Sequence, residues 1–184
     1  MSCPPPKKNI PVSEESFSLY RPMIRAAHGL TLAQISAITR LESSTIQNWI
    51  KRGFVAHPVE KKYFERQLAQ ILLIAALRDS MPLERIGAIM AQLNGDADDA
   101  SDDTVPEEQL YDYLCAVRQG LAESGFTRAR ALKVIDRVTE AYAAPDETAR
   151  RRLTAALLTV AAADEAARLR RMAEGCYEEL CAIQ

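Results

Sequence analysis

Apolar residues recur at three- and four-residue steps in two short segments of the N-terminal half, and this spacing predicts two packed helices. The first segment runs from Thr31 to Thr39, with Thr31 placed to cap its N-terminal end. Its inward face would carry Leu32, Ile35 and Ile38. A tight corner at residues 40–42 separates it from the second segment, so we expect the pair to form a helix-turn-helix.

The second predicted helix covers residues 44–52. Ser44 stands three residues before Gln47, which is the spacing of a capping box, and Gly53 suits the left-handed position at which a helix ends. The inward stripe would consist of Ile46, Trp49 and Ile50. The buried positions of a helix-turn-helix would then fall on Ile35, Leu41, Ile46 and Trp49.

The segment after Gly53 has a different pattern. Residues 54–64 have apolar, β-prone ends around a middle that contains Pro58, which predicts a small two-stranded wing carrying Lys61 and Lys62. An apolar run over residues 67–77 is far too short to span a bilayer and predicts a buried helix. Another helix should begin near Pro82, with Leu83, Ile86, Ile89 and Met90 facing inward.

The C-terminal half begins with an acidic segment. Residues 94–103 contain five Asp, but Ala100 occupies the third ligand position of a calcium loop, no Gly stands at its sharp turn and no Glu at its end. We therefore interpret residues 95–105 as a solvated linker. Amphipathic spacing predicts three further helices, over residues 106–121, 127–142 and 146–182. The last would be about 50 Å long, which favours contact with a second copy of the chain, although packing within one chain is a competing interpretation.

The outer side of the helix over residues 44–52 combines amide and cationic groups, which can contact base edges and phosphates in a major groove. We expect DNA contacts from this helix and from the wing. The candidate residues are Thr45, Gln47, Asn48, Lys51, Arg52, Lys61, Lys62 and Tyr63. A small helical corner with a solvated polar face is the alternative, and Gln47 would then serve only as a cap.

Several residues between positions 45 and 86 follow the order found in a known family. They are Thr45, Ile46, Trp49, Arg52 to Val55, Tyr63, Gln67, Leu68, Leu77, Arg78 and Leu83 to Ile86. In these positions the chain resembles the MerR-type winged helix-turn-helix DNA-binding domain. It is still more similar to an uncharacterised bacterial domain family, mostly from Gram-positive species, over residues 46–51, 61–63 and 110–115. The resemblance implies a transcription regulator whose 44–52 helix enters the major groove while the wing contacts the DNA backbone.

The chain also departs from the MerR pattern. Gln47, Asn48 and Trp49 stand where that family usually has an Arg followed by two Tyr. Arg40 occupies a turn position that usually holds Gly, and the wing is shorter and lacks its Gly and Arg. The long dimerisation helix and the effector-binding cysteines of metal-sensing members are not recognisable, so metal sensing has no support.

Charge is divided unevenly along the chain. Residues 1–94 contain 12 Lys and Arg against 7 Asp and Glu, a net charge of +5, whereas residues 95–184 contain 11 against 18, a net charge of −7. The basic half suits contact with phosphates, and the acidic half should point away from a duplex or serve another partner.

No pattern indicates catalysis. The four Cys lack zinc spacing and are expected to be buried free thiols, His28 and His57 stand apart from any nucleophile, and there is no glycine-rich phosphate loop. We therefore expect no enzyme activity, no cofactor and no metal. Residues 1–12 are rich in Pro and lack an apolar stretch, which predicts a loose arm rather than a signal peptide, and hence a cytoplasmic protein.

These expectations combine into one architecture. It is an all-α protein with an arm (1–12), a MerR-like winged helix-turn-helix unit with a two-stranded wing (13–94), an acidic linker (95–105) and a C-terminal helical bundle with a long last helix (106–184). The expected function is sequence-specific binding of double-stranded DNA by a transcriptional regulator that forms a homodimer through its C-terminal helices. The alternative is a helical protein–protein adaptor that keeps the fold without recognising DNA. The sequence identifies neither an operator nor a small-molecule effector.

Overall fold

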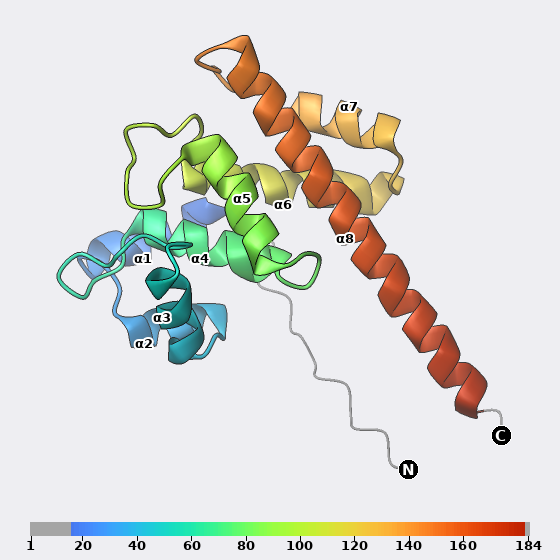
Figure 1. Ribbon diagram of the computed structural model, residues 1–184, viewed down its shortest axis with the longest axis horizontal. Helices are drawn as coiled ribbons and strands as arrows, with labels where there is room; N and C mark the ends of the chain where they lie inside the picture. Colours follow the sequence, from blue (N-terminus) through green and yellow to red (C-terminus); the bar gives the residue numbers. More distant parts are fainter. Residues whose placement is uncertain (1–15, 183–184) are drawn as a thin grey trace.

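The computed structural model describes residues 16–182, and every regular element within that range is helical (Figure 1). This confirms the predicted all-α class over the described residues, while the predicted arm over residues 1–12 lies outside them. In chain order the elements are η1 (Phe17–Leu19, a 3-10 helix), α1 (Arg21–Ala26), α2 (Leu32–Thr39), α3 (Ser43–Lys51), α4 (Glu65–Leu77), α5 (Leu83–Asn94), α6 (Glu107–Ser124), α7 (Arg128–Val138) and α8 (Glu147–Ala182).

Helices α2 and α3 form where the apolar spacing predicts them. The residues expected at the buried positions, Ile35, Leu41, Ile46 and Trp49, are all buried. Thr31 caps α2 as predicted, and a complete capping box forms there: Thr31 Oγ1 accepts from Gln34 N at 3.3 Å, and Gln34 Oε1 accepts from Thr31 N at 2.8 Å.

The cap predicted for the second helix is wrong. Helix α3 begins at Ser43, with Glu42 as its N-cap and no side-chain cap. The Ser43 hydroxyl lies 2.9 Å from the hydroxyl of Ser36 on α2, so it joins the two helices instead. Gly53 follows the end of α3 with a φ of 73°, the left-handed conformation that was expected there.

The predicted two-stranded wing is also wrong, because no strand forms within residues 16–182 and the 54–64 segment is a loop. Its tip is a two-residue hairpin turn in which Val59 and Lys62 pair across Glu60 and Lys61, whose φ angles are 50° and 62°. The pairing stops there because Tyr63 exchanges backbone hydrogen bonds of 2.8 Å with Leu30. The arm that leads into the turn is held separately, since Ala56 N donates to Oε1 of Gln70.

Helix α4 is the central element of the fold. Ten of its 13 residues are buried, which agrees with the predicted buried helix and with a segment that is apolar on all sides. It packs against α2, α5 and α6, so a single core continues from the N-terminal helices into the C-terminal ones. Each fully buried Leu or Ile contributes about 1.5–3 kcal/mol through the hydrophobic effect.

Most residues of the acidic segment between α5 and α6 are exposed, as expected of a solvated linker, but the segment also contacts α4. Arg66 of α4 pairs with Asp103 and also donates to the carbonyls of Ala97 and Asp99 at 3.1 and 2.9 Å. Val105 at its end is fully buried. Part of the segment is therefore folded back onto α4, because the half-buried guanidinium of Arg66 needs carboxylate and carbonyl partners.

The C-terminal helices α6, α7 and α8 pack against one another, and α8 is long, as predicted. Its 36 residues correspond to about 54 Å. Its first part lies across α5, α6 and α7, whereas its C-terminal end extends beyond the body of the protein (Figure 1). No helix among residues 16–182 is long and apolar enough to cross a membrane.

Candidate nucleic-acid interface

The polar face of α3 is open to solvent. Gln47, Asn48 and Lys51 are exposed and Thr45 is half-buried, while Trp49 on the inner side is only 4% exposed. Positions 47, 48 and 51 share one side of the helix because residues three and four apart are neighbours on a helical surface. The structure therefore brings together the two amides and the lysine that the sequence singled out.

Arg52 directly follows α3 and is held by neighbours. Its Nη2 donates to Glu84 Oε1 of α5 at 2.7 Å, and its guanidinium carbon lies 4.9 Å from the centre of the Phe54 ring. The pKa of Glu84 is lowered by hydrogen bonding, first from its own backbone N–H and then from Arg52. Both side chains are well exposed, so Arg52 can leave this pair at a modest energetic cost.

The anchoring of α3 to α5 depends on Phe54 and Gly87. A Cβ atom at Gly87 would lie 2.4 Å from Cε1 of the Phe54 ring, so only glycine leaves room for this packing. The ring fixes the end of α3 against α5, and it also supports the Arg52 guanidinium.

The three candidates in the 54–64 loop are placed differently from one another. Lys61 is exposed at the tip of the turn, where it is free to reach a phosphate. Lys62 is half-buried, and its Nζ donates to the carbonyl of Gly29 at 3.3 Å. Tyr63 is only 4% exposed, and burial raises the pKa of its hydroxyl. The expectation that Tyr63 contacts DNA is therefore corrected, because this side chain belongs to the core.

A carboxylate that no sequence pattern predicted lies beside the same loop. Asp98 accepts from His57 N at 2.7 Å and lies 2.9 Å from His57 Nδ1, although 41 positions separate the two residues. This contact brings the acidic segment close to the lysine-bearing loop. The positive potential there is reduced, which would weaken attraction to phosphates.

No cluster of three or more potential metal ligands occurs in the described part of the chain. The cysteines differ from the expectation of buried thiols: Cys115 is buried, but Cys176 and Cys181 are exposed on α8. The two exposed cysteines lie on the end of α8 that leaves the body of the protein. The spacing of residues there does not distinguish a buried side of the helix from an exposed one.

The fold and this surface define a helical protein built on a helix-turn-helix corner. Residues 24–114 match a family described as a domain of unknown function (DUF1836). The chain is also 32% identical over 85 residues to the uncharacterized protein YkrK of Bacillus subtilis, an alignment that covers 44% of this chain and 36% of YkrK. These matches confirm the expected similarity to an uncharacterised bacterial family. No solved structure matches the chain significantly.

Proposed function

We propose that this protein binds double-stranded DNA in a sequence-specific manner and regulates transcription without enzyme activity. The observation that carries the proposal is the exposed amide and lysine face of α3, supported from behind by the buried Trp49. In this proposal α3 enters the major groove, where Gln47 and Asn48 contact base edges and Lys51 contacts a phosphate. The MerR-like character of the domain belongs to the same proposal.

Lys61 at the tip of the 54–64 loop would contact the DNA backbone beside α3. The loop replaces the expected wing, and its tight turn projects one exposed lysine rather than a two-stranded surface. The backbone contact is therefore smaller than in a full winged helix, so affinity depends mainly on α3 and the residues that follow it.

We further propose that the DNA-binding form is a homodimer joined by the second half of α8. Ala167 is the last residue of α8 that is buried, and the helix continues for 15 residues beyond it. An isolated helix of this length is only marginally stable in water. Four large side chains are at least 45% exposed along it: Leu169, Met172, Tyr177 and Leu180. Such a stripe needs a partner surface.

The sequence of this C-terminal part of α8, residues 168–182, is complementary to itself when two copies run antiparallel. If two copies cross between Glu174 and Gly175, Leu169 of one copy lies level with Leu180 of the other, and Met172 lies level with Tyr177. Arg170, next to Leu169, then comes level with Glu179 of the second copy. A parallel arrangement would instead set like charges together, so charge favours the antiparallel dimer.

DNA binding is tested by selecting bound sequences from a random duplex library with the full-length chain, and then measuring affinity by fluorescence anisotropy at increasing salt. A protein that makes about six phosphate contacts should give a slope near about −5 for log affinity against log salt. Absence of any enriched sequence, with no saturable binding at low salt, would contradict the proposal.

Dimerisation is tested by sedimentation velocity on the wild-type chain and on the variant Leu169→Glu/Leu180→Glu. The wild type should sediment as a dimer and the variant as a monomer. Leu19→Glu is the matched control, since Leu19 is 59% exposed but lies far from α8 in the chain, and it should leave the dimer intact. A wild-type chain that stays monomeric at the concentrations used for NMR spectroscopy contradicts the dimer.

A protein–protein adaptor is the second candidate function, and the two carboxylates beside the interface favour it. Glu84 forms an ion pair with Arg52, and Asp98 lies beside the lysine-bearing loop, so part of the expected positive surface is neutralised. An adaptor would show no saturable DNA binding, and substitutions on the polar face of α3 would leave its behaviour with nucleic acid unchanged.

A further inference from the structure

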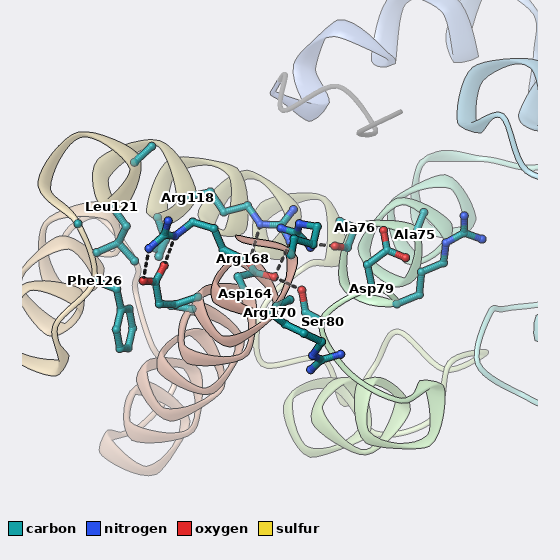
Figure 2. A pocket seen from close by; sticks show the side chains of 18 of the residues that line it. Ala75, Ala76, Asp79, Ser80, Arg118, Leu121, Phe126, Asp164, Arg168 and Arg170 are labelled. Atoms are coloured by element: carbon teal, nitrogen blue, oxygen red, sulfur yellow. Dashed lines mark hydrogen bonds and ion pairs between the residues drawn. The ribbon is translucent and has the colours of Figure 1, made fainter. Parts of the chain in front are cut away.

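A large groove lies on the body of the protein next to the α2–α3 corner (Figure 2). Its volume is about 1210 Å³. The walls come from the end of α4, from α6, from the body-facing side of α8 over residues 161–174, and from residues 39–41 of the corner. We call it the arginine groove, because six arginines line it: Arg40, Arg78, Arg118, Arg168, Arg170 and Arg171.

Part of the lining of the arginine groove is apolar, and we call this part the floor. Its side chains include Ala75, Ala76, Val117, Leu121, Phe126 and Ala161. In Figure 2, Leu121 and Phe126 lie toward one end and Ala75 toward the other. An apolar floor of this kind favours a hydrocarbon or aromatic group over a phosphate backbone.

A hydrogen-bond network crosses the groove between these ends (Figure 2). Arg118 Nε donates to Asp164 Oδ2 at 2.7 Å, and its Nη2 donates to the carbonyl of Ala76 at 2.8 Å. Ser80 donates to the same Asp164 carboxylate. The network ties α4, α6 and α8 together, so the groove is formed before any ligand arrives. Its Arg118 and Asp164 charges cancel each other.

The remaining charge of the groove is positive. Arg168 is paired with Glu165 through two hydrogen bonds of 2.7 Å. Arg40, Arg78, Arg170 and Arg171 make no ion pair within residues 16–182. Counting all lining residues, six arginines face four carboxylates, those of Asp79, Asp164, Glu165 and Glu174. The excess favours an anion, and guanidinium groups bind carboxylates with good geometry.

From these observations we propose that the arginine groove binds a small amphipathic organic anion. The acidic head group would be held by Arg40, Arg78 and Arg171, which the proposed dimer leaves unpaired, and the apolar body would lie on the floor. Ligand pockets of about 300–1,000 Å³ hold molecules of drug size, so the groove has room for one such ligand. The apolar stripe proposed for dimerisation, which includes Leu169 and Met172, does not line the groove and stays available.

A ligand in the groove would contact the α2–α3 corner directly. Arg40 holds this corner in a left-handed conformation with a φ of 56°, and the next residue, Leu41, is buried in the core. The ligand would thereby link α8 to the position of α3. A regulatory effect on DNA affinity rests on the proposed function, whereas binding of the anion itself does not.

The probe is decanoate, compared by isothermal titration calorimetry with decanol and decyltrimethylammonium, which carry the same chain with a neutral and a positive head group. The full-length wild type should bind one decanoate per chain, at least about tenfold more tightly than either analogue. The variant Arg78→Gln/Arg171→Gln should bind decanoate at least about tenfold more weakly. The control Arg151→Gln/Arg152→Gln changes two exposed arginines of α8 outside the groove and should bind as the wild type does.

A second variant tests the floor. Ala122 is exposed at the groove, so Ala122→Trp should fill part of it and weaken binding while leaving the melting temperature unchanged. Equal affinity for decanol and decanoate, or an equal loss in the Arg78→Gln/Arg171→Gln variant and its control, would overturn the proposal. Because these titrations contain no DNA, a failure of DNA binding leaves their result unaffected, and the two proposals fail separately.

Discussion

Arg52 Nη2 and Glu84 Oε1 lie 2.7 Å apart, which joins the residue after α3 to the first turn of α5. Glu84 competes with any phosphate for the guanidinium of Arg52. It also places a carboxylate beside the surface that we propose for DNA. Glu84 is 70% exposed, so its substitution tests this competition without disturbing the core.

Replacing Glu84 by Gln should increase DNA affinity, because it removes a negative charge and releases Arg52. Solvent screens an exposed ion pair of this kind, so the expected gain is small, up to about fivefold. Fluorescence anisotropy with the selected duplex measures it. The same change at Glu140, an exposed residue after α7, serves as the control. A loss of affinity in Glu84→Gln would show that Arg52 does not reach the DNA.

The variant Lys51→Ala/Arg52→Ala should bind DNA more weakly while its melting temperature stays nearly unchanged, because both side chains are exposed. Loss of two phosphate contacts should make the salt dependence shallower by about two in the slope of log affinity against log salt. Lys133→Ala, a change at an exposed lysine on α7, is the control for overall charge. Unaltered affinity in the double variant would rule out the proposed docking of α3.

Trp49→Ala should destabilise the protein by about 3–5 kcal/mol, because it leaves a large cavity behind α3. Chemical denaturation followed by circular dichroism measures this change in the free energy of unfolding. Asn48→Ala, which alters the exposed neighbour, should change stability very little. A Trp49→Ala variant of normal stability is the result that this prediction forbids.

Arg66→Met should destabilise the protein by up to about 3–5 kcal/mol, because it leaves the buried Glu107 and the half-buried Asp103 without their cation. Glu107 is 4% exposed and lies 3.3 Å from Arg66, and burial raises the pKa of its carboxyl above the ordinary value. Arg25→Met is the matched control: Arg25 also pairs with a glutamate, Glu65 at 3.8 Å, but is 76% exposed. That pair should contribute at most about 1 kcal/mol. Equal losses in the two variants would contradict the structural role of Arg66.

The acidic segment should become more mobile in strong acid. The backbone N–H of His57, and then its ring, hold the pKa of Asp98 below its usual value. A carboxylate with a lowered pKa stabilises the folded contact above its ordinary pKa of about 3.9, and this contribution is lost as pH falls through the lowered value. At neutral pH, Asp98→Asn should speed amide hydrogen exchange over residues 95–101, and this difference from the wild type should vanish in strong acid. Asp136→Asn on α7 should leave the exchange of that segment unchanged.

The spacing of apolar residues predicted the helices well, because a helix depends mainly on residues that are close in the sequence. Ile46 and Trp49 define the inner side of α3, and the continuous apolar run of α4 identifies a buried helix. The cap predicted at Ser44 is wrong because α3 begins one residue earlier, at Ser43, whose hydroxyl bonds with that of Ser36.

The other differences come from contacts between residues far apart in the chain. The contact between Arg66 and Asp103 spans 37 positions and holds the acidic segment against α4. The contact between Tyr63 and Leu30 spans 33 positions and takes the place of further pairing within the 54–64 loop. Neither contact has a periodic signature. For the candidate site, the exposed face of α3 could be predicted from its own spacing, whereas Glu84 and Asp98 could be found only in three dimensions.

The hydrogen bond between Gln70 and Glu107 decides where the chain can be cut without exposing its core. Gln70 Nε2 donates to Glu107 Oε1 at 3.0 Å, so the first turn of α6 completes the polar interior of α4. A fragment that stops at Asn94 would expose one flank of α4 to water, and it should aggregate. A relative that shared only residues 24–94 would therefore need its own cover for that flank, whether a further helix or another subunit supplied it.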